Sequence, residues 1–355
     1  MLEKITFSFT KLYIKFAVLF IFLKKERIYG DKSLSLRKLC LLARGFYSAH
    51  PIKYNFKKYK YSDYISDLEN VKLGYSNHPY NKLLRNKFVF SIFFNNYFRT
   101  PVCYCIINRA YIEPTNNTQK INSISSLFEL LSQKRIILKP IFGARGQGIY
   151  LIENSGLNDF KINKKVINRE ALQNFFMALD NYLVCEFIEQ SIFSKQFFPD
   201  STNTIRITTL CYSLNSSAFV PYSLMRFGRP KSIPADNSAI GGIFSLINLD
   251  TGELMEAVEI IEKGKIKFHS VHPDTGVLIK GVTIPNWEKL LDYIKNCATI
   301  IKPIIKIVGW DIILTNDSFV VIEGNNAPDL FMQGLNYPLA KNLDVLEFLR
   351  HYKIR

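Results

Sequence analysis

The sequence has few of the features that mark secreted, zinc-binding or membrane-spanning proteins. Its six cysteines are scattered, without a Cys-x-x-Cys pair or a Cys/His cluster at zinc spacing. We therefore expect reduced cysteines that serve as small buried side chains in a cytoplasmic protein. The apolar run from Phe16 to Leu23 is much shorter than the roughly 20 residues of a membrane-spanning helix. No small-residue cleavage site for a signal peptide follows it.

Two common catalytic motifs, internal repeats and low-complexity runs are also missing. The chain has no Gly-x-x-x-x-Gly-Lys-Ser/Thr loop, no internal repeat, no low-complexity run and no pattern typical of a covalent enzyme nucleophile. What is present suits a folded enzyme or binding protein, because 48% of the 355 residues are hydrophobic and 14% are aromatic. Such a composition excludes general disorder and allows a sizeable core. Apolar patterns of helical and of strand period interleave along the chain, which favours an α+β or α/β fold.

Positive charge is concentrated near the N-terminus. Residues 1–60 hold fourteen Lys and Arg against three acids, a net charge of +11 out of +16 for the whole chain. Two readings of the Phe16–Leu23 run stay open: a buried helix, or an amphipathic segment lying on an anionic membrane with lysines at the lipid headgroups. Nucleic acid is the least supported partner, because no recognised binding module accompanies the basic residues.

The pattern of helix and strand signals divides the chain into three regions, 1–85, 86–185 and 186–355. The first is basic and helical, and the other two mix helices with strands. The helices are expected near 34–42, 86–98, 126–133 and 286–301, the third with a capping box formed by Ser126 and Glu129. The strands are expected over 102–107, 136–139, 148–152, 307–315 and 319–323.

A glycine-rich loop joins two of these strands. The strand Ile136–Lys139 ends in a lysine, and the loop that follows carries Gly143, Arg145, Gly146 and Gly148. Glycines allow backbone N–H groups to approach phosphate oxygens closely, and Lys139 and Arg145 would add positive charge. A hairpin turn without any function is the alternative reading, since glycine patterns alone are weak signals.

Two acids are predicted to face each other in a later hairpin. If the hairpin is symmetric about Asp317, then Asp311 lies opposite Glu323, and Asn325 falls on the face of Glu323. Facing carboxylates among apolar neighbours repel each other unless a cation lies between them. Carboxylate and amide oxygens are suitable ligands for Mg²⁺ bound together with substrate phosphates. The alternative is a shifted register in which each acid is separately solvated.

Two arginines occur in predicted strands where burial would be costly. Arg206 lies in the alternating run Thr204–Leu210, and Arg226 precedes Phe227 and Gly228. A buried arginine is unfavourable unless it meets an anion. The anion could be a phosphate or acyl phosphate, which we favour, or a carboxylate in a structural salt bridge.

Taken together, these residues resemble the ATP-grasp superfamily and, more narrowly, the ATP-grasp proteins associated with sugar transfer in bacterial polysaccharide gene clusters. The resemblance extends over about 86–335. The matching segments are Asn86-Lys87, Lys139, Gly143–Gly148, Glu186, Asn203-Thr204-Ile205-Arg206, Arg226-Phe227-Gly228, Asp236-Asn237, Gly241-Gly242, His272-Pro273-Asp274-Thr275-Gly276, Gly309-Trp310-Asp311 and Glu323-Gly324-Asn325.

The resemblance implies an ATP-grasp fold, in which two α+β subdomains clasp ATP, and it implies roles for individual residues. Lys87 and Lys139 would contact the α- and β-phosphates. Glu186, Phe187 and Ile188 would form the hinge beside the adenine, and Glu189 is a candidate for the ribose. Arg206 and Arg226 would be the catalytic arginines. One or two Mg²⁺ ions would be held by Asp311, Glu323 and Asn325.

The activity implied is that of an ATP- and Mg²⁺-dependent carboxylate–amine ligase that forms an acyl phosphate, in cell-surface polysaccharide biosynthesis or modification. Its partners would be an acid and an amine, either small molecules or glycan precursors. Residues 1–60 would give peripheral contact with the inner membrane face. Two alternatives stay open: a kinase acting on a sugar hydroxyl, and a non-enzymatic basic protein that binds membrane or nucleic acid.

Overall fold

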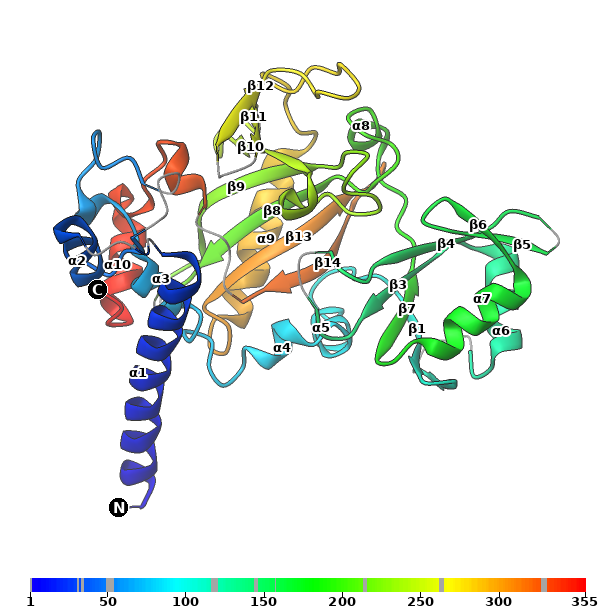
Figure 1. The fold of residues 1–355 in the computed structure, drawn as a ribbon, viewed down its shortest axis with the longest axis horizontal. Helices are drawn as coiled ribbons and strands as arrows, with labels where there is room; N and C mark the ends of the chain where they lie inside the picture. Colours follow the sequence, from blue (N-terminus) through cyan, green and yellow to red (C-terminus); the bar gives the residue numbers. More distant parts are fainter. Residues whose placement is uncertain are drawn as a thin grey trace.

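The computed structural model describes residues 2–355 except 31, 33–34, 49–53, 116–120, 144–145, 157, 213–215, 262–264 and 327–330. Its strands form two seven-stranded sheets, and all neighbouring strands within them run antiparallel. Helices pack beside both sheets, which confirms the expected α+β class. Figure 1 shows the two sheets side by side, with the N-terminal helices at the far end of the second sheet.

The first sheet carries the lysine strand and the glycine-rich loop. Its strand order is β2 (Tyr111–Pro114), β1 (Cys103–Asn108), β7 (Tyr182–Glu186), β3 (Ile136–Pro140), β4 (Tyr150–Asn154), β5 (Asp159–Ile162) and β6 (Lys165–Asn168). Helices α6 (Ile124–Gln133) and α7 (Arg169–Ala178) bury an apolar face against this sheet, where Leu127, Leu172 and Phe176 are fully enclosed.

The second sheet carries both arginines and the acidic hairpin. Its strand order is β12 (Ile266–His269), β11 (Leu254–Ile260), β10 (Ile243–Ile247), β9 (Phe219–Phe227), β8 (Thr204–Leu210), β13 (Ile307–Leu314) and β14 (Phe319–Asn325). Helix α9 (Trp287–Ile301) covers one face with Leu290, Ile294 and Ile301, as its helical spacing predicts.

The other helices and turns lie around this second sheet. Helix α3 packs against α1, and α10 packs against β9. In order they are α1 (Leu2–Tyr29), α2 (Leu36–Ala43), η1 (Tyr61–Asp63), α3 (Asp67–Leu73), α4 (Lys82–Arg85), α5 (Lys87–Phe94), α8 (Ile192–Lys195), η2 (Ser238–Ile240), η4 (Phe331–Leu335), η5 (Leu339–Lys341) and α10 (Leu343–His351).

Two predicted helix ends were wrong. Helix α6 begins at Ile124, because the Ser123 hydroxyl accepts a hydrogen bond from the backbone N–H of Ser126 at 3.2 Å. Ser126 is therefore the third helical residue, and the expected capping box with Glu129 does not form. Helix α5 ends at Phe94 rather than near residue 98. Its start is as expected, since the Asn86 side chain accepts from the N–H groups of the second and third helical residues.

The acidic hairpin has the predicted pairing at its acids but a different register at its turn. Asp311 pairs with Glu323, whereas Ile312 pairs with Val321, so Ile322 is an extra residue in a β-bulge. The turn is centred between residues 316 and 317, because the Thr315 N–H donates to the Ser318 carbonyl at 2.9 Å. A one-residue shift at the turn is thus compensated by the bulge, and the two carboxylates still meet.

Helices α4 and α5 pack against β14 although they precede the first sheet in the chain. Leu84, Phe90 and Phe94 are buried in the core of the second sheet. The region boundary expected at residue 86 stays a prediction. The consequence of this packing is that helix α5 presents its first residue, Lys87, directly to the acids of the second sheet.

Substituting Gly324 with alanine should destabilise the protein by about 1–3 kcal/mol, the usual cost of overpacking a core. An alanine Cβ there would lie 2.8 Å from the Phe90 ring and 2.9 Å from Leu84. The matched control is Gly156→Ala, because nothing lies within 4 Å of a Cβ at that position. Denaturant unfolding of both variants measures the difference. Equal stability of the two would contradict the tight packing of α5 on β14.

No helix in the described part of the chain is both long and apolar enough to cross a bilayer. The described cysteines are all free, and all but Cys40 are buried, as the interpretation of most of them as small buried side chains predicts.

Candidate nucleotide and metal site

One large cavity, about 910 Å³, is lined by residues of both sheets. The first sheet contributes β3, β7 and the glycine-rich loop, and the second contributes β8, β9, β13 and β14. A cavity of this size suits a ligand as large as a nucleotide together with part of a second substrate. Most residues that the sequence singled out line it: Lys87, Lys139, Gly143, Gly146, Glu186, Phe187, Ile188, Arg206, Arg226, Asp311, Glu323 and Asn325.

The two lysines approach the cavity from different elements. Lys139 lies at the end of β3, and Lys87 is the first residue of α5. The Lys87 ammonium donates to the Gly143 carbonyl at 2.9 Å and lies 3.8 Å from a carboxylate oxygen of Glu323. Burial lowers the pKa of Lys87, and the nearby Glu323 charge opposes that shift. Lys87 therefore connects the glycine-rich loop of one sheet to the acid pair of the other.

The glycine-rich segment is a hairpin loop between β3 and β4, as expected. Gly146 has a φ of +72°, and a Cβ there would lie 3.2 Å from Ala235 on the second sheet's loop. Gly148 has a φ of +71° and backs onto the Tyr182 hydroxyl instead of lining the cavity. The loop is also longer than predicted, because β4 begins at Tyr150 and not at residue 148. Arg145 lies outside the described residues.

The predicted hinge joins the two sheets, and its side chains are already engaged. The Glu186 carboxylate accepts from Arg99 at 2.8 Å and from the Val102 N–H at 3.1 Å. The guanidinium of Arg135 lies 4.1 Å from the centre of the Phe187 ring. Ile188 is buried at the cavity wall. The Glu186 carboxylate and the Phe187 ring thus already have partners within the protein, and binding of the adenine by the hinge stays a prediction.

Glu189 has a different position from the other predicted residues. Its carboxylate forms ion pairs with Arg135 and Lys195, is about half exposed, and is not among the described residues that line the cavity. These cations, against the opposing effect of burial, lower the pKa of Glu189. The exposed-loop reading of this acid fits the structure, and a ribose contact stays a prediction.

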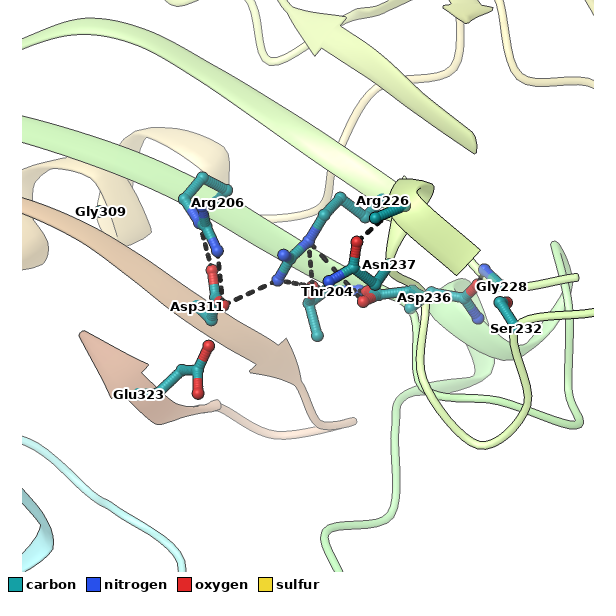
Figure 2. Close-up of polar contacts among 12 residues, drawn as sticks. Thr204, Arg206, Arg226, Gly228, Ser232, Asp236, Asn237, Gly309, Asp311 and Glu323 are labelled. Carbon is teal, nitrogen blue, oxygen red and sulfur yellow. Dashed lines mark hydrogen bonds and ion pairs between the residues drawn. The ribbon is translucent and has the colours of Figure 1, made fainter. Parts of the chain in front are cut away.

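The arginines and acids form a row across adjacent strands. Arg206 of β8 pairs with Asp311 of β13, which in turn pairs with Glu323 of β14. Figure 2 shows Arg206 and Arg226 converging on the Asp311 carboxylate, with Glu323 beside it. Arg206 donates through both Nε and Nη2, the latter at 2.7 Å, and Arg226 Nη2 lies 2.9 Å from Asp311 Oδ2.

Within the protein, the partner of Arg206 is a carboxylate. Asp311 receives a bidentate contact from Arg206, so the salt bridge that the sequence allowed as one alternative is present. Burial would raise the pKa of Asp311, but Arg206 and Arg226 outweigh it and hold that pKa well below its usual range. Asp311 is therefore ionised at all ordinary pH values. Contact of either arginine with phosphate stays a proposal.

A second carboxylate fixes Arg226 from the opposite side and was not among the predicted site residues. Asp236 accepts from the Thr204 N–H at 2.7 Å and lies 3.7 Å from Arg226 Nε. The Thr204 hydroxyl accepts from Arg226 Nε at 3.0 Å. Asp236 lies in the loop 234–239, which lines the cavity wall near both arginines. Its place in the Asp236-Asn237 motif was the only signal in the sequence.

The backbone of this loop leaves no space for a side chain at Gly242. A Cβ there would lie 2.3 Å from the Asp236 carbonyl oxygen. Asn237 starts the η2 turn by accepting from the Ala239 N–H at 2.8 Å. The turn reading and the pocket reading of this motif are thus compatible, since Asn237 both caps η2 and lines the cavity.

His272 has a structural position. It is fully buried, its Nε2 lies 2.9 Å from the Gly228 carbonyl, and its ring stacks on Phe198. Burial lowers the pKa of His272. It does not line the cavity in the described part of the chain, which is what its interpretation as a turn residue predicts.

The acids and the amide offer oxygens suited to a hard cation. Asn325 Nδ2 donates to Asp311 Oδ2 at 3.3 Å and to Glu323 Oε1 at 3.3 Å, so the three predicted ligands lie together. The amide nitrogen faces the two acids, and a flip of the amide would bring its oxygen to the same place. Burial and the Asp311 charge raise the pKa of Glu323, and Lys87 partly opposes this. A cation would relieve that repulsion. Among the described residues no three His, Cys, Asp or Glu side chains gather, so the candidate set is two carboxylates and one amide, which fits Mg²⁺.

Two antiparallel sheets that share a nucleotide-sized cavity, one with lysines and a glycine-rich hairpin and the other with acids, define the class: this is an ATP-grasp fold. The family follows from comparison with known proteins. The chain belongs to the sugar-transfer associated ATP-grasp family, whose profile matches residues 70–343. No curated protein matches the chain.

Solved structures with a similar fold include several ligases and synthetases. N5-carboxyaminoimidazole ribonucleotide synthetase in its ADP complex is 10% identical, with a TM-score of 0.40 over 73% of this chain and 52% of that one. D-alanyl-alanine synthetase A from Vibrio cholerae is 8% identical, with a TM-score of 0.44 over 77% and 66%. L-amino acid ligase from Bacillus licheniformis is 12% identical, with a TM-score of 0.37 over 78% and 52%. The chain thus spans between half and two thirds of the length of these proteins.

Proposed function

We propose that the protein is an ATP-dependent carboxylate–amine ligase that acts in cell-surface polysaccharide biosynthesis or modification. The observation that carries the proposal is the large cavity that Lys87, Lys139, Asp311 and Glu323 all line. The glycan context rests on membership of the sugar-transfer associated family. In the reaction, a substrate carboxylate oxygen attacks the γ-phosphorus of ATP and ADP leaves. An amine then attacks the acyl phosphate carbon, and it loses a proton as inorganic phosphate departs.

The chain's own residues would act by positioning and by charge. Lys139 and Lys87 would hold the phosphates as point charges from two sides, and the Gly143–Gly146 loop would cover them with backbone N–H groups. Phe187 and Ile188 would bind the adenine. Arg226 lies between Asp236 and Asp311, where its guanidinium could move a short distance to the carbonyl or phosphoryl oxygens of the acyl phosphate.

Asp311, Glu323 and Asn325 would hold one or two Mg²⁺ ions. When bound, Mg²⁺ neutralises charge on the β- and γ-phosphates. Arg206 would keep the Asp311 carboxylate ionised and correctly turned, because it contacts both oxygens of that carboxylate.

ADP formation by the purified protein tests this proposal. The assay contains ATP, Mg²⁺ and a panel of amino acids combined with uronic acids or amino sugars. We expect ADP formation that requires both an acid and an amine. The variant Glu323→Gln should reduce turnover by about 100-fold or more, the usual scale for loss of an electrostatic catalytic group. Activity of this variant at the wild-type level would contradict the metal assignment.

The pH dependence of Mg²⁺ binding should report Glu323. Protons compete with the cation, so binding should weaken as the pH falls through the Glu323 pKa, which lies above its ordinary value. Lys87 lowers that pKa, so Lys87→Met should move the midpoint to higher pH. Isothermal titration of Mg²⁺ over a pH series measures both midpoints. A midpoint that moves down in the variant, or stays unchanged, would contradict the geometry.

A further inference from the structure

Helix α1 carries an apolar stripe that the described chain leaves uncovered. Phe16, Leu19, Phe20 and Leu23 are between 49 and 67% exposed. Their spacing of three and four residues places them on one face of the helix. Figure 1 shows α1 projecting from the body of the protein, with its C-terminal turns nearest to the rest of the chain. These four residues are called the α1 stripe below.

The opposite face of α1 already has its partners. Val18 and Phe22 are buried, and the Phe22 ring stacks on Tyr47 at 5.0 Å. Glu26 is also buried, and its carboxylate accepts from the Ser48 N–H at 3.0 Å. One face of the helix is therefore packed against the body of the protein, and the other face, the α1 stripe, is apolar and exposed. A helix that is apolar all round requires a second apolar surface or a membrane.

The surroundings of the α1 stripe are positively charged. Lys24, Lys25 and Arg27 are exposed directly after it. Within residues 14–60, Glu26 is the only acidic side chain that the structure describes, and it is buried. The nearby helix α2 repeats the pattern, because Leu36 is 83% and Leu39 is 57% exposed among further basic residues.

We propose that the α1 stripe docks the protein on an anionic lipid surface, with the flanking basic side chains at the headgroups. An anionic bilayer would cover the apolar side chains with its acyl layer, and its headgroups would supply negative charge to the basic side chains beside them. A second copy of the chain would instead bring two positively charged surfaces together, which opposes association. The inference is independent of the proposed reaction, since no residue of the stripe lines the cavity.

Vesicle co-sedimentation of the full-length protein tests the docking surface. The vesicles contain phosphatidylcholine with or without phosphatidylglycerol. We expect binding only with the anionic lipid. Phe16→Ser with Phe20→Ser should weaken it by about tenfold or more, the scale expected when two buried aromatic side chains are lost. Lys24→Glu with Lys25→Glu should weaken it by about tenfold or more as well, and added salt should do the same.

Matched controls separate this surface from general stickiness. Ile192→Ser with Ile300→Ser removes two side chains that are 76 and 63% exposed elsewhere. Lys265→Glu with Lys267→Glu reverses two exposed lysines at the edge of the second sheet. Both controls should bind anionic vesicles like the wild type, and circular dichroism should show all variants folded. The proposal is overturned if the wild type does not bind, or if the controls lose binding equally. It is also overturned if the Phe16/Phe20 variant changes only the self-association of the protein.

Discussion

Replacing Asp311 with asparagine should lower the free energy of unfolding by about 3–5 kcal/mol, the cost of removing one partner from a buried ion pair. Asp311 is almost fully buried and neutralises both Arg206 and Arg226. The substitution removes the ion-pair partner of Arg206 and leaves Arg226 with Asp236 alone, at 3.7 Å. Turnover of ATP should be abolished at the same time. Urea unfolding followed by circular dichroism measures the stability loss.

Glu323→Gln is the matched variant. Glu323 pairs with Asp311, but its pKa is raised whereas that of Asp311 is lowered. The pKa of Glu323 is raised by burial and by Asp311, so the folded protein disfavours its charged form. A neutral glutamine should therefore leave the free energy of unfolding unchanged or slightly higher, while turnover is still lost. Equal destabilisation by both substitutions, or a fully stable Asp311→Asn protein, would contradict the arrangement described.

The pKa of Asp311 determines how the stability of the folded protein changes with pH. The pKa of Asp311 in the folded protein is depressed. Its contribution to stability is present above its unfolded-state pKa and is lost as the pH falls through the folded-state value. The wild type should therefore lose more stability than Asp311→Asn on acidification.

Lys87→Met should weaken ATP binding by about tenfold to a hundredfold, corresponding to one lost charge-assisted contact. Two structural effects contribute. The ammonium that would face the phosphates is removed, and the contact that ties the glycine-rich loop to α5 through the Gly143 carbonyl is lost. Lys87→Arg should restore only part of the affinity, because a guanidinium does not fit a point-charge site.

The control for this prediction is Lys82→Met. Lys82 lies on the neighbouring helix α4 and is exposed, so its removal changes the net charge of the protein equally without touching the cavity. Isothermal titration with ATP and Mg²⁺ gives the affinities. If both variants bind ATP equally well, Lys87 has no special role in the cavity.

Features of the fold that depend on residues close together in the chain could be predicted from the sequence. The Asp311–Glu323 pairing could be predicted because a short polar turn joins two apolar strands. The compensating bulge at Ile322 could not, since it depends on whether the turn hydrogen bond closes at Ser318. Likewise, the start of α5 follows from Asn86, whose side chain caps the helix that begins at Lys87, whereas the end of the helix depends on tertiary packing.

The partners of the arginines lay beyond sequence reasoning. Arg206 and Asp311 are 105 residues apart, and they meet because β8 lies beside β13 in a sheet whose strand order does not follow the chain. The cost of burying Arg206 indicated that an anion was needed but could not distinguish a phosphate from a carboxylate. The same is true of Asp236, whose role appears only when its loop folds back onto Thr204.

Transfer of ¹⁸O from a labelled substrate carboxylate to inorganic phosphate tests the central claim most directly. The protein is incubated with ATP, Mg²⁺, ¹⁸O-carboxylate uronic or amino acids and the amine panel, and the released phosphate is analysed by mass spectrometry. The account predicts one ¹⁸O atom in each phosphate released, because the acyl phosphate breaks between carbon and oxygen. A stable phosphate ester without label in free phosphate would contradict it, as would the absence of ATP cleavage with every pair in the panel.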